Sequence, residues 1–349
     1  MAGPSKSREI FERFGGNPIL SATDFPSTVN AVFNPGATEI NGRTLLLLRV
    51  EDRAGLSSLA VATSDNGVSN WEVDAIRGLQ PQTDRIEEHW GIEDPRVTRI
   101  GNEYYVVYVG YSAFGPLVSL AKTHDFMNWE RCGVLQPPED KDAALFPTTF
   151  DGRWALIHRP VPAMTGLGNH IWLSYSPDLH YWGDAHVLLA ARRGSHWDAN
   201  KIGLGPPPML TKDGWLLCYH GVRETASGSI YRVGLALLDR DDPSKVLARC
   251  NEWVFGPQAP YEQSGDVPGV VFPCGWILRD DGDTVHLYYG AADSVVCVAE
   301  ASLSRMLNHL EEFPGALDAG RTPLNEFLGG QSWARRAEDQ SPTFVTGEQ

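Results

Sequence analysis

The sequence predicts an all-β fold, a five-bladed β-propeller, and two observations support this prediction. A proline opens an apolar strand in five places, and successive prolines are separated by 60, 52, 60 and 66 residues. Each proline is followed by two further apolar strands, with turns rich in Gly, Asp and Asn between them. This period is typical of four-stranded blades around a central axis. A β-sandwich or a two-domain all-β protein is the alternative with the same strand content.

The innermost strand of each predicted blade contains one of the prolines. These strands are VFNPGA at 32–37, IEDPRV at 92–97, LFPTTF at 145–150, GPPPML at 205–210 and VFPCGW at 271–276. The second strands are predicted at 43–52, 103–112, 153–160, 214–222 and 284–293, and the third at 57–65, 116–125, 170–178, 231–239 and 294–302. The first three of the third strands each end in an aspartate near a tryptophan: Trp71, Trp129 and Trp182.

The two ends of the chain differ from this pattern. Helical stretches are predicted only near residues 5–13 and 302–313, so the propeller carries short terminal helical segments. We expect one propeller domain over residues 1–330. Residues 331–349 are polar and lack apolar periodicity, which predicts a loose C-terminal tail.

Composition and charge limit the class of protein. The 349 residues include 29 basic and 44 acidic side chains, a net charge of -15, which argues against nucleic acid or an anionic membrane as a partner. The amino end lacks the apolar stretch of a secretory signal, and no run of about 18 apolar residues occurs. The five cysteines show no C-x-x-C pair, which favours reduced thiols and a cytoplasmic protein without a metal site.

Equivalent positions of the five blades converge at one mouth of a propeller channel. The residues before two of the prolines, Asn34 and Asp94, are expected to be extended and to lie at this mouth. The other candidate residues come from the ends of second strands, from segments next to the prolines or, for Tyr231, from the start of a third strand. They are Arg49, Asp52, Arg96, Arg159, Lys201, His220, Tyr231 and Asp293.

A cluster of basic residues in a net acidic protein predicts a pocket for a compact anion. Arg49, Arg159, Lys201 and His220 would together suit an oxyanion such as phosphate, with Asp94 facing it. Aromatic side chains near the mouth, including Tyr231, would suit stacking on sugar rings. The alternative interpretation is that these charges are structural ion pairs at blade junctions.

Nine motifs, in order along the chain, identify a family. They are FNPGA, LLRVEDR, GIEDPR, KDAALFP, IHRP, SYSPDLHYWG, NKIGLGPPP, GWLLCYHGV and LLDRDDPSKV. With these motifs the chain resembles the β-mannoside phosphorylases of glycoside hydrolase family 130 almost end to end. The resemblance implies a five-bladed propeller, a β-mannoside di- or oligosaccharide as substrate, and a possible homo-oligomer.

The resemblance also implies an inverting reaction in which inorganic phosphate attacks the anomeric carbon and α-mannose 1-phosphate is released. Asp94, in the EDPR motif, takes the family's general acid position, with its proton passed through the 3-hydroxyl of the mannosyl unit. Arg159, Lys201 and His220 take the positions that bind phosphate. The sugar-binding set is expected to be Asn34, Arg49, Asp52, Arg96, Tyr231 and Asp293. Phosphate is a co-substrate, and no cofactor is implied.

Two alternatives remain open at this stage. An inverting mannosidase of the same fold would need a second carboxylate as base, and Glu51, Asp52 and Asp293 are the candidates. Phosphate already carries negative charge and needs no such base, so one acid with a basic cluster favours phosphorolysis. A non-catalytic glycan-binding propeller is the second alternative, and the presence of Asp94 argues against it.

Overall fold

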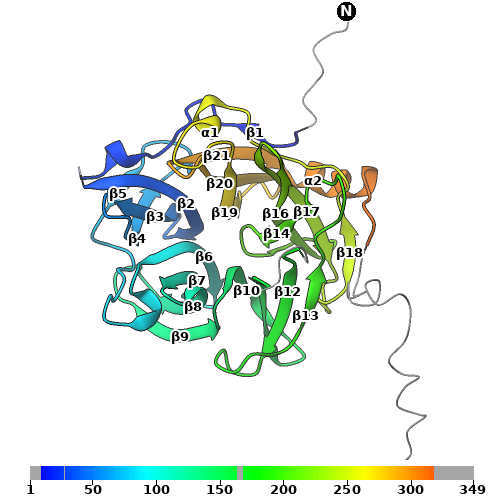
Figure 1. The fold of residues 1–349 in the computed structure, drawn as a ribbon, viewed down its shortest axis with the longest axis horizontal. Coiled ribbons are helices and arrows are strands. Elements are labelled where there is room, and N and C mark those ends of the chain that lie inside the picture. Colours follow the sequence, from blue (N-terminus) through cyan, green and yellow to red (C-terminus); the bar gives the residue numbers. More distant parts are fainter. Residues whose placement is uncertain (1–8, 27, 163–167, 318–349) are drawn as a thin grey trace, which may run out of the picture.

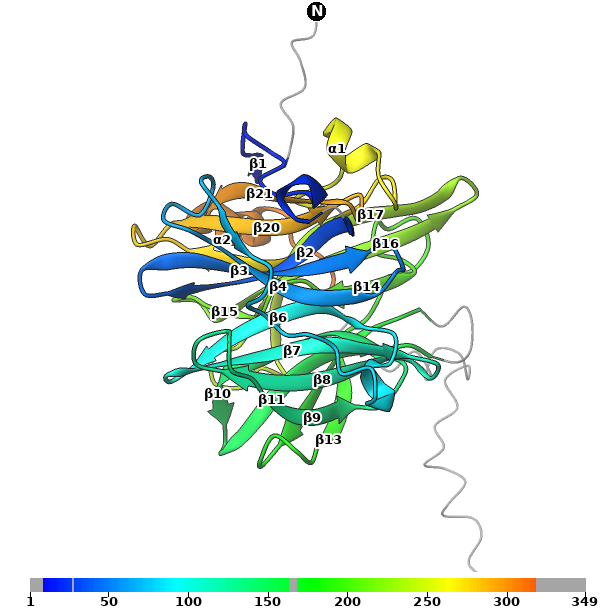
Figure 2. The same cartoon turned by 90° about the vertical axis from the view of Figure 1, so that its left-hand side faces the viewer.

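The computed structural model describes residues 9–26, 28–162 and 168–317, and these residues form five small antiparallel sheets arranged in a ring (Figure 1). Figure 2 shows the blades following one another down the side of the ring. The prediction of a five-bladed propeller is thus confirmed, and the sandwich alternative is excluded. The predicted boundary at residue 330 and the predicted tail at 331–349 lie outside the described residues.

Each blade is a meander in chain order from the channel outward. Blade one has β2 (Val29–Ile40), β3 (Arg43–Asp52), β4 (Ser57–Ser64) and β5 (Glu72–Asp74), and blade two has β6 (Ile92–Ile100), β7 (Glu103–Ser112), β8 (Gly115–Thr123) and β9 (Glu130–Gln136). Blade three has β10 (Asp140–Phe150), β11 (Arg153–Pro160), β12 (Ile171–Ser176) and β13 (Gly183–Leu189). Blade four has β14 (Lys201–Leu204), β15 (Met209–Leu210), β16 (Trp215–Thr225), β17 (Gly228–Leu238) and β18 (Val246–Arg249). Blade five has β19 (Val271–Leu278), β20 (Thr284–Ala291) and β21 (Val295–Ser302) with β1 (Glu12–Arg13) at its outer edge.

The second strands are continuous apolar runs because both faces of a blade are covered by neighbouring blades. In β3, Leu45, Leu46, Leu47 and Leu48 are all fully buried. Successive side chains of a strand point to opposite faces. Leu45 and Leu47 accordingly pack in the cluster shared with blade two, and Leu46 and Leu48 in the cluster shared with blade five. Burial on both faces replaces the apolar/polar alternation expected of a one-sided sheet.

The N-terminal segment closes the ring as a strand. Glu12 pairs with Glu300 and Arg13 with Ala299, so β1 becomes the outermost strand of blade five. The Arg13 guanidinium holds it there with hydrogen bonds to Glu262 at 2.8 Å and to Glu9 at 2.7 Å. The helix expected at 5–13 is therefore wrong for residues 9–13, because pairing with the exposed edge of β21 outweighs local propensity. Residues 5–8 lie outside the described residues.

Short helices complete the described chain. The expected C-terminal helix is present as α2 (Leu303–Glu312), and its N-cap Ser302 accepts a hydrogen bond from the Arg305 amide. The other helical segments are α1 (Pro260–Gln263) and two 3-10 turns, Ala22–Asp24 and Ile86–Glu88. Among the described residues, no helix is long and apolar enough to cross a bilayer.

The turns after the third strands repeat in blades one to three. In blade two, Asp125 Oδ1 accepts hydrogen bonds from the Met127 and Asn128 amides, just before Trp129. Asp178 closes the turn of blade three in the same way. In blade one, Asn66 rather than the expected aspartate does this. A short polar side chain that bonds to the amides two and three residues ahead is the shared requirement.

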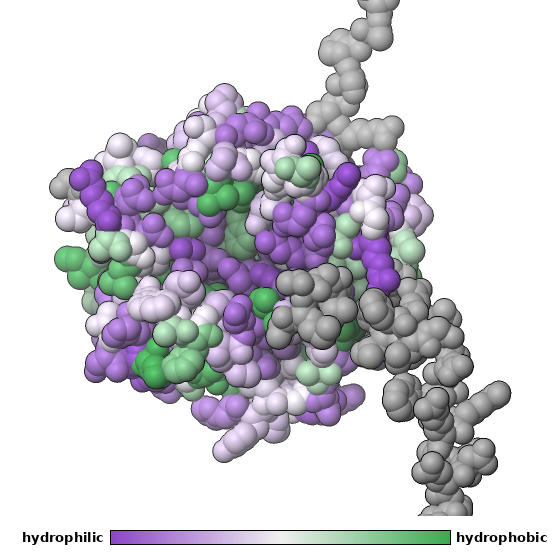
Figure 3. Space-filling model, viewed as in Figure 1, coloured by the Kyte–Doolittle hydropathy of each residue, from purple (hydrophilic) through white to green (hydrophobic). Residues whose placement is uncertain are grey.

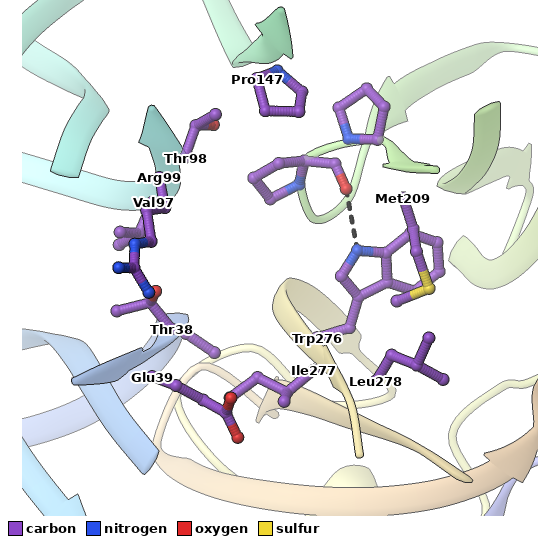
Figure 4. Close-up of a pocket in the computed structure, with 13 residues that line it drawn as sticks. Thr38, Glu39, Val97, Thr98, Arg99, Pro147, Met209, Trp276, Ile277 and Leu278 are labelled. Carbon is purple, nitrogen blue, oxygen red and sulfur yellow. Dashed lines mark hydrogen bonds between the residues drawn. The ribbon is translucent and has the colours of Figure 1, made fainter. Parts of the chain in front are cut away.

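The channel does not continue as one open pore. Near its middle the Arg96 guanidinium is buried and donates to the carbonyl oxygens of Leu204 and Gly205. Beyond it lies a cavity of about 300 Å³ at the far end, to which all five blades contribute (Figure 4). Trp276 lines one side of this cavity, and its indole N–H donates to the Pro207 carbonyl at 2.8 Å.

Pro147 and Pro207 line this far cavity, so they are not equivalent to Pro35 and Pro95. The predicted alignment of the five prolines is correct in number of blades but wrong in register for blades three and four. The blade-three residues equivalent to Asp94 and Pro95 are Asp142 and Ala143, as the positions of the strand irregularities show.

Candidate active site

The amino ends of the inner strands and the carboxyl ends of the second strands meet at the mouth opposite the Trp276 cavity, because the strands within each blade are antiparallel. The face of the molecule in Figure 3 is hollowed at the centre of the ring, and hydrophilic residues line this hollow. The sequence-predicted residues Asn34, Asp94, Arg159, Lys201 and His220 all lie on strand ends that reach this mouth.

Three of the inner strands carry a polar residue on a bulge near their amino ends. The pairing of β2, β6 and β10 with their second strands slips at Asn34, Asp94 and Asp142. These residues have φ of 45°, 47° and 52°, in the left-handed region rather than the extended one. The expectation of extended backbone at Asn34 and Asp94 is therefore wrong. Asn and Asp tolerate this region better than other side chains, and the bulge aims them inward from three blades.

Asp94 is buried, with 2% of the residue exposed. Its Oδ1 accepts hydrogen bonds from Asn34 Nδ2 at 2.9 Å and from Arg49 at 3.2 Å. Burial by itself would raise the pKa of Asp94, but the charges of Arg49, Lys141 and Arg96 lower it below its usual value. Asp94 is thus a carboxylate in the ligand-free protein.

Arg49 is held by groups on both sides of Asp94. Its guanidinium bonds to Glu93 at 2.9 Å and to Ser57 Oγ at 3.0 Å, and it lies 4.5 Å from the centre of the Phe33 ring. Glu51 lies at 3.4 Å. Because three carboxylates surround Arg49, its charge is balanced within the protein, and its hydrogen bond holds Asp94 in place.

Asp142 is a candidate site residue that the sequence pattern of prolines did not identify. It is fully buried, and its Oδ2 accepts a hydrogen bond from Arg159 Nε at 2.6 Å. Arg96 lies 3.7 Å from its other oxygen, and His220 Nε2 lies 3.5 Å from Oδ2. Burial would raise the pKa of Asp142, but Arg159 above all holds it well below its usual range. The sequence carries a signal for it, because Lys-Asp-Ala-Ala at 141–144 matches Glu-Asp-Pro-Arg at 93–96, but an alignment of the repeats on Pro147 hides this match.

Two lysines supply uncompensated positive charge. Among the described residues, neither Lys141 nor Lys201 has a carboxylate at ion-pair distance, although Lys201 lies 5.6 Å from the centre of the Tyr231 ring. Burial, together with the neighbouring charge of Arg159, lowers the pKa of Lys201. Lysine charges that are partly buried and unpaired are costly, so they indicate a place for a bound anion. Lys141 was not among the predicted site residues.

His220 does not contribute positive charge. Burial first, and then the charges of Arg159 and Lys201, lower its pKa to about 3 against the attraction of Asp142. The neutral ring lies against Phe272, with ring centres 4.8 Å apart, and near Tyr231 at 6.3 Å. The position of this ring also explains why residue 203 is a glycine. A Cβ at Gly203 would lie 2.1 Å from Asp142 Oδ2 and 2.5 Å from His220 Cε1. The cationic character of the pocket therefore rests on Arg159, Lys141 and Lys201.

Asp293, between β20 and β21, completes the group around Asp94. Burial, followed by the negative charge of Asp94, raises the pKa of Asp293 to about 6. Asp293 and Asp94 therefore differ in protonation below this pH, although both are aspartates at the same mouth.

We predict that Asp94→Asn lowers the pKa of Asp293, because the substitution removes a negative charge that disfavours its ionisation. Carboxyl ¹³C NMR of selectively labelled protein would measure it, with a midpoint near pH 6 in the wild type. Asp281, an exposed turn residue whose pKa is lowered to about 2 chiefly by its hydrogen bond from Thr284, is the control and should not respond. An unchanged Asp293 midpoint would show that the two carboxyl groups are not coupled.

Two predicted site residues lie apart from the mouth cluster. Asp52 Oδ1 accepts hydrogen bonds from the Ala54 and Leu56 amides, so it closes the turn between β3 and β4. Arg96 is placed below the mouth, where its guanidinium also donates to the Asp94 carbonyl at 2.8 Å and approaches Phe272. Both residues shape the backbone that carries the site.

The arrangement suits acid-assisted displacement by an anion. One enclosed carboxyl group, Asp94, lies beside a pocket whose positive charges are not fully paired, and Tyr231 and Asp293 border both parts. Within the described ranges, no three His, Cys, Asp or Glu side chains are grouped so that they could hold a metal ion.

Comparisons with known proteins agree on one family. The model of glycoside hydrolase family 130, described as beta-1,4-mannooligosaccharide phosphorylase, matches residues 6–312. A 1,2-beta-oligomannan phosphorylase of Thermoanaerobacter is 36% identical over 303 residues, which cover 82% of this chain and 96% of that protein. A beta-1,4-mannooligosaccharide phosphorylase of Ruminococcus albus is 30% identical over 315 residues, covering 88% and 93%. The beta-1,2-mannobiose phosphorylase from Listeria innocua, solved with beta-1,2-mannobiose, has a TM-score of 0.79 and 32% identity, covering 86% and 99%.

Proposed function

The chain belongs to glycoside hydrolase family 130, and from that membership we propose how its own residues carry out the phosphorolysis of β-mannosides. The enzyme cleaves a β-mannosidic bond with inorganic phosphate and releases α-mannose 1-phosphate and a shortened sugar. The observation that supports this assignment of roles is the position of Asp94 beside a pocket with the unpaired charges of Lys141 and Lys201.

In this proposal phosphate binds between Arg159, Lys201 and Lys141, with neutral His220 at its edge. A phosphate oxygen attacks the anomeric carbon from the face opposite the glycosidic oxygen, and the carbon–oxygen bond to the leaving sugar breaks. The leaving oxygen takes up the proton of Asp94, directly or through a sugar hydroxyl. Positioning and charge supply most of the rate increase in such a displacement.

Asp94 must carry a proton for this step, although its pKa is lowered in the ligand-free protein. Phosphate bound beside Lys141 would offset part of the positive field that acts on Asp94. The pKa of Asp94 would then rise, because burial remains and the opposing charge weakens. Phosphate therefore provides the nucleophile and also, by raising the pKa of Asp94, favours the protonated form of the acid.

Hydrolysis is the less favoured reaction. A base for water would have to come from Glu51, Asp52 or Asp293. Glu51 is at ion-pair distance from Arg49, and Asp52 closes a turn. Asp293 borders the site, and within the described residues its side chain makes no hydrogen bond. Because its pKa is raised to about 6, it is protonated below that pH and cannot then act as the base.

We further propose a cytoplasmic location and a β-1,2- or β-1,4-linked mannoside as substrate. Free cysteines, four of them buried, support a reducing compartment. The relatives are named for both linkages, so both are tested below.

We predict cleavage of β-1,2- or β-1,4-mannobiose only in the presence of phosphate, with α-mannose 1-phosphate detected by ³¹P NMR.

Lys201→Ala should raise the KM for phosphate about 10- to 100-fold, because a charge-assisted contact is lost. Exposed Lys212, in the turn at the far end of the same blade, is the matched control, and Lys212→Ala should leave this KM unchanged.

Three outcomes would contradict parts of the proposal. Cleavage without phosphate would identify a hydrolase. No cleavage under any condition would favour a glycan-binding propeller. An unaltered phosphate requirement in Lys201→Ala would remove Lys201 from the anion pocket.

A further inference from the structure

Exposed aromatic side chains are concentrated at one place on the molecule. Among the described residues, four Phe, Tyr or Trp side chains are exposed: Trp90 at 46%, Tyr111 at 38%, Phe114 at 61% and Tyr181 at 78%. The first three belong to blade two, in the segment before β6 and in the β7–β8 hairpin. Exposed aromatic groups gathered on one edge indicate a binding surface more often than scattered single residues do.

The backbone holds this cluster in a defined geometry. The Trp90 amide donates to the Tyr111 carbonyl at 2.9 Å, and the Tyr111 amide donates to the Gly91 carbonyl at 3.1 Å. The Trp90 and Tyr111 rings meet edge to face, with centres 5.6 Å apart and an angle of 65° between planes. The pair is thus preorganised, and a ligand would not have to order it.

The cluster lies at the same mouth as Asp94 and is connected to it. Gly91 forms a parallel bridge with Ser57, whose hydroxyl accepts from Arg49, and Arg49 donates to Asp94. Trp90 precedes Asp94 by four residues, so their Cα atoms are at most about 14 Å apart. The aromatic cluster therefore lies within reach of an oligosaccharide whose cleaved bond is at Asp94.

A pyranose ring presents a face of C–H groups and an edge of hydroxyls, which matches an exposed aromatic ring with a polar rim. We propose that Trp90, Tyr111 and Phe114 form a stacking platform for the distal sugars of an oligomannoside, on the leaving-group side of the bond. The platform makes the enzyme prefer chains longer than a disaccharide. This inference rests on the proposed function, since it takes the ligand to be the enzyme's own substrate.

The test compares mannobiose, mannotriose and mannotetraose of whichever linkage the enzyme cleaves. In the wild type, kcat/KM should rise with chain length. Trp90→Ala should lower kcat/KM for mannotetraose about 10-fold and leave the value for mannobiose unchanged, whereas Trp90→Phe should retain most of the preference. Tyr181→Ala is the matched control, because Tyr181 is an exposed aromatic residue at the opposite end of the blades.

The following outcomes would contradict the proposed stacking platform. Equal kcat/KM for all chain lengths in the wild type, or equal losses for mannobiose and mannotetraose in Trp90→Ala, would overturn it. A wild-type dimer that dissociates in Trp90→Ala, with the chain-length preference intact, would show that the cluster joins two copies.

Failure of the proposed function gives a different result, namely no phosphate-dependent cleavage of any chain. Calorimetric binding of mannotetraose then decides the platform by itself. Weaker binding to Trp90→Ala than to the wild type would support it, and equal or absent binding would overturn it.

Discussion

Asp94→Asn is expected to reduce kcat/KM for phosphorolysis by at least about 100-fold, because the leaving oxygen would depart without a proton. The amide is close in size to the carboxyl group, so the bulge of β6 and the packing around it should persist. The variant should still bind mannose, since Asn34, Arg49 and the phosphate pocket are unchanged. Initial rates, circular dichroism and a mannose titration together measure this.

The control for this loss is Asp281→Asn, which changes an aspartate in the turn between β19 and β20 at the far end of blade five. It should retain wild-type kinetics. Near-normal turnover in Asp94→Asn would assign the acid to another group. Loss of turnover together with loss of the folded signal would show that Asp94 is needed for structure instead.

Asp142→Asn is expected to lower the free energy of unfolding by about 3 kcal/mol, because it leaves the buried charges of Arg159 and Arg96 without their shared counter-ion. Arg159 would also lose the bond that aims it, so the KM for phosphate should rise. Urea denaturation measures the first effect, and phosphate kinetics the second.

The stability difference depends on pH with a defined sign. Because Arg159 holds the pKa of Asp142 below its usual range, the stabilisation is complete above the unfolded pKa of about 4. It decreases as the pH falls below that value, so wild type and Asp142→Asn should converge in acid. A constant difference across this range would mean that the carboxylate charge is not the cause.

An exposed ion pair provides the comparison for Asp142. Arg153 and Asp184 form such a pair between β11 and β13, with side chains that are 42% and 73% exposed. Asp184→Asn should cost less than about 1 kcal/mol. If the two substitutions cost the same, burial of the Asp142 cluster would not be the source of its contribution.

The fold was predictable because its signal is repeated. The second strands end within a few residues of their predicted positions in all five blades. Each is a run of β-branched, aromatic or leucine residues that is buried on both faces. Such a run can be recognised as a strand from the local sequence alone. The N-terminal segment was mistaken for a helix because its partner, β21, lies almost 290 residues away in the sequence, at Glu300 and Ala299.

The site was predictable only in part. Asn34 and Asp94 stand before prolines, which made their positions visible. Asp142 does not precede a proline, so the proline pattern does not show its equivalence to Asp94, which the slip in strand pairing establishes. His220 could be identified as a site candidate from its motif, but its neutral state follows from burial and from Arg159 and Lys201, which come from other parts of the chain.

The sequence by itself determined the five-bladed ring and the family, since both depend on residue patterns that recur or occur in order along the chain. The tertiary structure decided which charged side chains pair with one another and which remain unpaired and free to bind a ligand. Asp94, Asp142 and Asp293 are the same residue type, yet the pKa values of Asp94 and Asp142 are lowered whereas that of Asp293 is raised. Burial and the distances to Arg49, Arg159 and Lys141 set that difference, and these exist only after the blades have closed.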